Sequence, residues 1–212
     1  MILFGTDGIR GRYGDFPLDD STIKKIGCSI AKSFDNTVKK VIIGHDGRES
    51  CGAILDSLTE GINFINNYDI INLGLFPTPS LSLILSKNDS EDAIGIEITA
   101  SHNPYLDNGI KIFDKNGYKI SSELERKIEE IVATQNDVNI TSSTKFVDSS
   151  PMKSVYIDFI SGLLSSIKKC RTHLNVAVDC ANGATSHVIN DITFPDNTVS
   201  YTHLRAHETL RY

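Results

Sequence analysis

Hydrophobic residues along the chain follow two alternating spacings, one typical of helices and one typical of strands. Helical spacing recurs over residues 23–34, 54–65, 81–85 and 124–132. Short apolar runs between them predict strands at residues 41–44, 70–73, 94–98 and 110–113. Strands that alternate with helices predict an α/β domain with a mostly parallel or mixed sheet. In such sheets, ligands collect at the loops beyond the carboxyl ends of the strands.

The pattern changes over residues 134–150, which are rich in Asn, Ser, Thr and Asp. We therefore predict a first domain over residues 1–133 and a linker over 134–150, with one strand possible at 145–147. Beyond the linker, a helix over 151–167 and a strand over 174–178 predict a second α/β domain that begins at 151 and runs to residue 200. We expect this second domain to be incomplete. The last residues, 201–212, are richer in His and Arg than the body of the chain, and we expect a non-native tail there.

Three local features carry structural interpretations. Ser122 and Glu125 have the spacing of a capping box, which predicts that a helix opens at Ser122. The cysteines lack metal-binding spacing and are interpreted as small buried thiols in a reducing compartment: Cys28, Cys51, Cys170 and Cys180. His203 and His207 are four residues apart, but no third ligand accompanies them, so a metal site there is not favoured.

Composition and charge exclude several classes of protein. The 212 residues carry 21 basic and 27 acidic side chains, a net charge of −6, which argues against a general nucleic-acid-binding protein. No apolar run approaches the roughly 18 residues of a membrane span. The first residues do not have the pattern of a signal peptide, so we expect a cytoplasmic protein.

Four polar clusters adjoin predicted strands, where loops can project into a shared cleft. They are Phe4–Gly11, Gly44–Arg48, Thr99–Pro104 and Asp107–Lys111. In the first, three glycines let the backbone approach a ligand, and Arg10 can bind phosphate or carboxylate oxygens; the alternative is a tight turn with a surface arginine. In the second, Arg48 is either a phosphate ligand or a support that pairs with Asp46.

The other two clusters carry a nucleophile and a base. Ser101 is a candidate nucleophile or phosphoryl acceptor, with a plain turn as the alternative. In an extended segment, adjacent side chains point to opposite sides, so His102 is not expected to activate Ser101. Lys111 is predicted to begin a strand whose apolar neighbours would desolvate an ammonium and favour acid/base use. Its alternative is a surface lysine on an edge strand.

Together the four clusters resemble those of the α-D-phosphohexomutase family, over residues 3 to about 190. The resemblance implies that Ser101 is the phosphorylated serine, that Arg10 faces the transferring phosphoryl group and that Lys111 is the acid/base. It implies that His102 contacts the substrate or orients its loop. Thr6, Arg10, Arg48 and Asn103 are the residues then expected to bind substrate or phosphate. The implied fold is the mixed-sheet α/β first domain of the family followed by an incomplete second α/β domain.

The segment Thr6–Arg10 is typical of the glucosamine branch of that family. The resemblance therefore implies interconversion of glucosamine 6-phosphate and glucosamine 1-phosphate, through a phosphoserine and a 1,6-bisphosphate, with Mg²⁺ as cofactor. The alternatives are a phosphoglucose or phosphomannose substrate, or a phosphosugar-binding fragment without catalysis. The expected partner is a phosphosugar, with neither nucleic acid nor membrane, and a homodimer is considered for a full-length enzyme.

The chain also departs from the family. It lacks the Asp-Gly-Asp-x-Asp-Arg loop that supplies metal carboxylates, the Glu-x-Ser-Gly-His sugar-recognition loop and the Arg-x-Ser-Gly-Thr phosphate loop. Mg²⁺ requires close to octahedral oxygen ligation, and the phosphate on Ser101 would supply one ligand. We therefore expect a truncated and inactive fragment.

Overall fold

The computed structural model describes residues 2–34, 38–65, 68–87, 92–137, 144–166, 174–194 and 198–202. The chain divides into two compact units, residues 1–149 and residues 150–212. Within the described ranges, every helix is too short or too polar to cross a membrane.

A seven-stranded mixed sheet organises the first unit, with the strand order β1-β2-β6-β5-β3-β4-β7. The strands are β1 (Phe4–Gly5), β2 (Gly8–Arg12), β3 (Lys40–His45), β4 (Asp69–Leu75), β5 (Ala93–Ile98), β6 (Asp107–Phe113) and β7 (Phe146–Val147). Strand β3 is parallel to β4 and β5, and β7 is parallel to β4. Strand β6 is antiparallel to both β5 and β2, and β1 is antiparallel to β2. The predicted α/β class with a mixed sheet is thereby confirmed.

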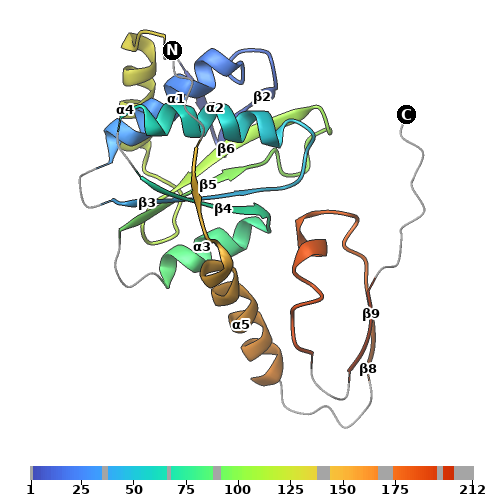
Figure 1. Cartoon of the computed structure of the whole chain (residues 1–212). Coiled ribbons are helices and arrows are strands. Elements are labelled where there is room, and N and C mark those ends of the chain that lie inside the picture. Colours follow the sequence, from blue (N-terminus) through green and yellow to red (C-terminus); the bar gives the residue numbers. More distant parts are fainter. Residues whose placement is uncertain are drawn as a thin grey trace. The chain divides into compact units, whose positions relative to one another are not determined.

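Helices cover both faces of this sheet (Figure 1). One face carries α1 (Asp20–Ser33), α2 (Cys51–Asn63) and α4 (Ser122–Thr134), and the other carries α3 (Thr78–Ser86). In the main core, apolar residues of α1, α2 and α4 pack against isoleucines of β3, β5 and β6. Helices α1 and α2 touch through glycines, since a Cβ on Gly27 would lie 2.2 Å from the Leu58 carbonyl oxygen.

The sequence prediction was wrong at two places in this unit. The cluster Phe4–Gly11, interpreted as a loop, lies in a β-hairpin formed by β1 and β2, and β2 pairs with β6. Helix α4 is capped by Ser121, whose Oγ accepts a hydrogen bond from the Leu124 amide at 3.2 Å, and not by Ser122. The strand that the sequence allowed at 145–147 is present as β7, and it joins the edge of the sheet beside β4.

The second unit contains α5 (Ser150–Ser166), β8 (Leu174–Val178), a 3₁₀ turn (Ala184–His187) and β9 (Thr198–Thr202). Strands β8 and β9 are parallel, so the first two residues of the predicted tail, Tyr201 and Thr202, belong to a strand. Ile167, Cys170, His203 and His207 lie outside the described residues. Of the described cysteines, Cys28 and Cys51 are buried and Cys180 is partly exposed.

Candidate active site

The four polar clusters meet at one end of the sheet. Strands β3 and β5 run in parallel and end level with each other, with His45 opposite Ile98. Strand β6 returns beside β5, and its Gly109 carbonyl accepts a hydrogen bond from the Thr99 amide at 3.0 Å. On its other side, β6 pairs with β2, where Arg10 is opposite Gly109. Segments that are far apart in the sequence therefore lie together at one end of the sheet.

Gly109 is the point where three of these segments come closest. A Cβ at this position would lie 2.5 Å from the Ile9 carbonyl oxygen, 2.7 Å from Arg10 Cδ and 2.7 Å from the Thr99 carbonyl oxygen. Two of these contacts are to backbone, which cannot move away cheaply. Glycine at 109 therefore allows the Arg10 side chain to lie across β6 beside the serine loop.

The Ser101 loop, residues 99–107, connects β5 to β6. Arg48 binds this loop through hydrogen bonds to its backbone. Arg48 Nε donates to Asp46 Oδ2 at 2.8 Å, which fixes the plane of the guanidinium. The remaining four guanidinium N–H groups donate to carbonyl oxygens of the Ser101 loop: Pro104, Asp107, Ser101 and Asn103. An arginine has five N–H donors, so none is left for a substrate phosphate in this structure. The alternative interpretation of Arg48, a support paired with Asp46, describes this geometry, and the phosphate-ligand interpretation does not.

Asp46 links that support to the serine. Its Oδ2 accepts a hydrogen bond from Thr99 Oγ1 at 2.7 Å, and Thr99 Oγ1 accepts one from the Ser101 amide at 2.9 Å. Burial alone would raise the pKa of Asp46, but the hydrogen bonds from Arg48 and Thr99 outweigh it and hold the pKa below its usual value. Asp46 is therefore a carboxylate at neutral pH, and its charge is part of the loop's support.

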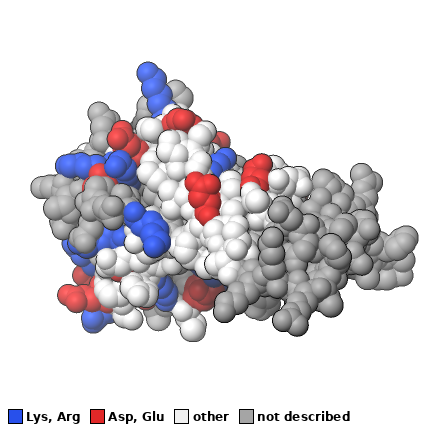
Figure 2. All heavy atoms as spheres, turned by 90° about the horizontal axis from the view of Figure 1, so that it is seen from below, with Lys and Arg blue, Asp and Glu red and all other residues white. Residues whose placement is uncertain are grey.

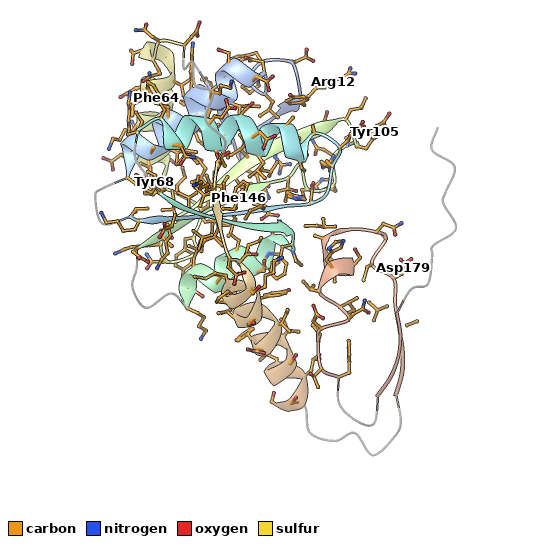
Figure 3. The ribbon with its side chains drawn as sticks, viewed as in Figure 1. Arg12, Phe64, Tyr68, Tyr105, Phe146 and Asp179 are labelled. Carbon is orange, nitrogen blue, oxygen red and sulfur yellow. The ribbon has the colours of Figure 1, made fainter. Side chains whose placement is uncertain are left out.

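Ser101 is exposed, with a φ of 58°, at the turn of the loop. A non-glycine residue with positive φ is uncommon, and here the Arg48 and Thr99 hydrogen bonds hold it. Ser101 Oγ lies 3.3 Å from His102 Nδ1. The expectation that the two side chains point apart was wrong because the segment is a turn and not extended. The Tyr105 ring projects from the tip of the same connection, at the end of the sheet where Arg12 also lies (Figure 3).

Lys111 and Arg10 meet on one carboxylate. Lys111 Nζ lies 2.8 Å and Arg10 Nη2 2.9 Å from Asp7 Oδ2. Lys111 first, and then Arg10, lower the pKa of Asp7. Lys111 lies inside β6 rather than at its start. The sequence predicted apolar neighbours around its ammonium group, but the ammonium forms an ion pair with Asp7. The Asp7 side chain is 59% exposed, so the two cations share an anion position that is open to solvent.

Two further predicted residues lie at the rim of this site. Thr6 is exposed in the turn of the β1–β2 hairpin, and its carbonyl oxygen accepts a hydrogen bond from Lys119 Nζ at 3.0 Å. Asn103 is exposed and donates from Nδ2 to Asp107 Oδ2 at 3.1 Å. Both side chains are accessible to a ligand.

Sequence reasoning missed Asp7, Thr99 and Glu97 as parts of this site. Asp7 and Thr99 could have been noted, since each is a polar residue within a cluster already selected. Glu97 lies within residues 94–98, for which the sequence predicted only a strand. The structure buries all six residues of β5, Glu97 included. The signal was the central position of the strand, because a strand covered by helices on both faces is buried on both.

The described residues do not form a metal site by themselves, since no group of three or more His, Cys, Asp or Glu lies close enough to hold an ion. Basic and acidic side chains are interspersed over the face shown in Figure 2.

Residues 1–139 match the family described as phosphoglucomutase/phosphomannomutase, alpha/beta/alpha domain I. The chain belongs to the phosphoglucomutase/phosphomannomutase family. The resemblance predicted from the four clusters is thus confirmed. The chain is 39% identical over 193 residues to a protein of Aliarcobacter butzleri named phosphoglucosamine mutase, covering 87% of this chain and 42% of that protein. A protein of the same name from Nautilia profundicola is 37% identical over 187 residues, covering 87% of this chain and 41% of the relative.

Solved structures share the fold. A phosphoglucomutase/phosphomannomutase family protein from Burkholderia thailandensis matches with a TM-score of 0.69 at 23% identity, over 95% of this chain and 44% of that chain. The phosphoprotein pp63/parafusin, a phosphoglucomutase from Paramecium, matches with a TM-score of 0.62 at 20% identity, over 89% of this chain and 40% of that chain. The chain thus spans less than half the length of the relatives that it matches.

Proposed function

We propose that this chain is the phosphoserine-bearing part of a phosphosugar mutase that interconverts glucosamine 6-phosphate and glucosamine 1-phosphate. The observation that carries the proposal is the Ser101 loop itself. An exposed serine stands at a turn whose backbone is held by Arg48 and Thr99, at the same end of the sheet as the Arg10–Lys111 cation pair. The names of the relatives support the choice of sugar.

In the proposed reaction, phosphorylated Ser101 gives its phosphoryl group to a free hydroxyl of the sugar phosphate. The bond between phosphorus and Ser101 Oγ breaks, and a bond between phosphorus and the sugar oxygen forms. The proton leaves the sugar hydroxyl and ends on Ser101 Oγ, so that the serine hydroxyl is regenerated. The 1,6-bisphosphate reorients and returns its other phosphoryl group to Ser101. The phosphoryl oxygens carry the developing charge, so positioned cations are the main requirement.

The chain's own residues have distinct roles in this proposal. Arg10 neutralises the transferring phosphoryl group, and Lys111 moves a proton to or from the sugar hydroxyl. Both now share Asp7, so an incoming phosphate would compete with that carboxylate for the same two cations. His102 Nδ1, 3.3 Å from Ser101 Oγ, orients the serine or contacts the sugar. Thr6 and Asn103, at the rim of the site, bind the substrate or its phosphate.

Mg²⁺ is the cofactor expected from the resemblance, and a phosphate on Ser101 would be one ligand. The described residues gather no carboxylate cluster to complete its coordination, so no step is assigned to the ion. Cytoplasmic localisation and a homodimer remain predictions. A glucose or mannose phosphate as substrate remains the alternative, because the family description names those two sugars.

The test is Ser101→Ala in a protein that carries this chain together with the remaining length of its relatives. We expect turnover of glucosamine 6-phosphate to fall to the assay background, because the phosphoryl carrier is gone. The matched control is Ser86→Ala, an exposed serine at the end of α3 whose Oγ donates only to the Leu83 carbonyl, and it should retain activity. Intact mass after incubation with the bisphosphate should show one phosphate on the wild type and none on Ser101→Ala. Normal turnover by Ser101→Ala would exclude the proposed mechanism, and a panel of hexose phosphates decides the sugar.

A further inference from the structure

Glu97 is a buried carboxyl to which the proposed reaction assigns no role. It lies in β5 and is 1% exposed. Its neighbours Ile96 and Ile98 point into the main core, so Glu97 points to the opposite face of the sheet, the face that α3 covers. A buried acid costs free energy, and one at the centre of a sheet requires a reason.

The residues around Glu97 make room for its carboxyl group. In the sheet, Glu97 is opposite Gly44 of β3 on one side and opposite Lys111 of β6 on the other. A Cβ at position 44 would lie 2.7 Å from Glu97 Oε2, so the carboxyl group occupies the space that glycine leaves. Thr78, at the start of α3, donates from Oγ1 to Glu97 Oε1 at 3.4 Å.

Two charged groups act on this carboxyl: Asp46, which directly follows β3, and Lys111 of β6. Burial first, and then the Asp46 carboxylate, raise the pKa of Glu97, while the Thr78 hydrogen bond and the Lys111 charge lower it; the net pKa is about 8. Helix α3 adds no titratable side chain, since its sequence is TPSLSLILS. At neutral pH, Glu97 is therefore an uncharged acid between Asp46, which supports the Ser101 loop, and Lys111.

We propose that Glu97 is a positioning residue for this site, which in its uncharged form leaves Asp46 paired with Arg48 and Lys111 paired with Asp7. The inference rests on the proposed function, because it concerns the same serine loop and lysine. An ionised Glu97 would place a second negative charge near Asp46 and would compete with Asp7 for the Lys111 ammonium. Loss of the proton should therefore disturb the Ser101 loop and Lys111 together.

The direct test is a pH titration by NMR of the 212-residue chain, labelled with ¹³C and ¹⁵N. We expect the Glu97 side-chain carboxyl carbon to titrate near pH 8, and the backbone amides of residues 99–107 and of Lys111 to shift with the same midpoint. In Glu97→Gln, which keeps the shape and removes the titration, these amides should lose that transition. The matched control is Glu60→Gln, which removes a carboxylate of α2 that is paired with Lys24 of α1, and its loop amides should keep the transition.

A stability measurement gives an independent readout. A folded pKa near 8 against a usual value of 4.5 means that the folded state holds an extra proton between these pH values. Stability from the uncharged acid is then complete below pH 4.5 and is lost as pH rises toward 8. Relative to Glu97→Gln, the unfolding equilibrium constant of the wild type should increase by up to about tenfold per pH unit across that window.

Turnover then separates this inference from the proposed function. In the longer protein, kcat of the wild type should decline as Glu97 ionises, whereas Glu97→Gln should lack that decline with an unchanged KM. A Glu97 that titrates near 4.5, or loop amides that titrate alike in wild type and Glu97→Gln, would overturn the inference. Retained turnover by Ser101→Ala would overturn the proposed function alone, because the loop titration is measured without turnover.

Discussion

Arg48 is the residue on which the order of the Ser101 loop depends most. Residues 101–106 are all exposed, so apolar packing contributes little to holding the loop. The four hydrogen bonds from Arg48 to the carbonyl oxygens of the loop take that place. The Arg48 side chain is only 12% exposed, and hydrogen bonds from a charged donor in such a position are stronger than those at the surface.

Arg48→Ala is therefore expected to lower the free energy of unfolding by about 3 kcal/mol, because it leaves the largely buried Asp46 without its cationic partner and removes four hydrogen bonds to the Ser101 loop. Urea unfolding of the chain measures this loss. Arg48→Lys should recover only part of it, since an ammonium cannot reach several carbonyl groups in a plane. The control is Arg126→Ala, an exposed arginine on α4, which should change the free energy by less than about 0.5 kcal/mol. A loss below about 1 kcal/mol for Arg48→Ala would contradict the role given to the guanidinium.

At the residue scale, the sequence predicted an ion pair between near neighbours better than it predicted the burial and tertiary contacts of single residues. The pairing of Arg48 with Asp46 was one of two interpretations, because two residues that are close in sequence can meet within a turn. The burial of Glu97 and the contact between Ser101 and His102 could not be predicted in this way. Each depends on tertiary structure: on α3 covering β5, and on Arg48 bending the loop into a positive φ at Ser101.

The start of α4 shows how tertiary pairing decides an element's boundary. Two adjacent serines precede the helix, and sequence spacing favoured Ser122 because Glu125 follows three residues later. In the structure, the Ile120 amide donates to the Ile112 carbonyl at 3.2 Å, which keeps the chain extended beside β6. Ser121 is then the first residue free to cap the helix, with a ψ of 153°.

Ser121→Ala is expected to cost about 1 kcal/mol of stability, because the Leu124 amide loses its acceptor. Ser122→Ala, the matched control one residue later, should change stability by a few tenths of a kcal/mol at most, since a residue in the first turn has no capping role. Thermal and urea unfolding of both variants measure the difference. A larger loss for Ser122→Ala would restore the original capping box.

Long elements were predictable and the short hairpin was not. The helices α1, α2, α4 and α5 and the strands β3 to β6 follow apolar spacing that is visible in the sequence. Strands β1 and β2 contain three glycines in the segment from Phe4 to Gly11, and glycine disfavours strands. Their pairing is stabilised by β6, about 100 residues later, through Ile9 opposite Ile110. A pairing with a strand so distant in the sequence cannot be predicted from the residues of the hairpin alone.

At the scale of the whole molecule, the first unit contains its own core. The main cluster of buried apolar residues runs from Leu3 to Val132, and none of its members comes from the described residues of 150–212. Helix α4 binds the start of the chain, because Glu129 Oε1 accepts hydrogen bonds from the amides of Leu3 and Phe4 at 2.7 and 2.9 Å. The seven strands of the sheet all lie within residues 1–149.

A chain that ends at residue 149 is therefore expected to fold by itself, with a free energy of unfolding for this unit within about 1 kcal/mol of its value in the 212-residue chain. Urea unfolding followed by circular dichroism measures it, and the Glu97 and Arg48 variants can then be compared in the shorter chain. A chain that ends at residue 120 lacks α4 and serves as the contrast. It loses the buried side chains of Ile128 and Val132 and both Glu129 hydrogen bonds, so it should be unfolded without denaturant, since each buried aliphatic side chain contributes about 2 kcal/mol or more. A chain of 149 residues that fails to unfold cooperatively would mean that residues 150–212 are needed to complete the core, contrary to the distribution of buried side chains.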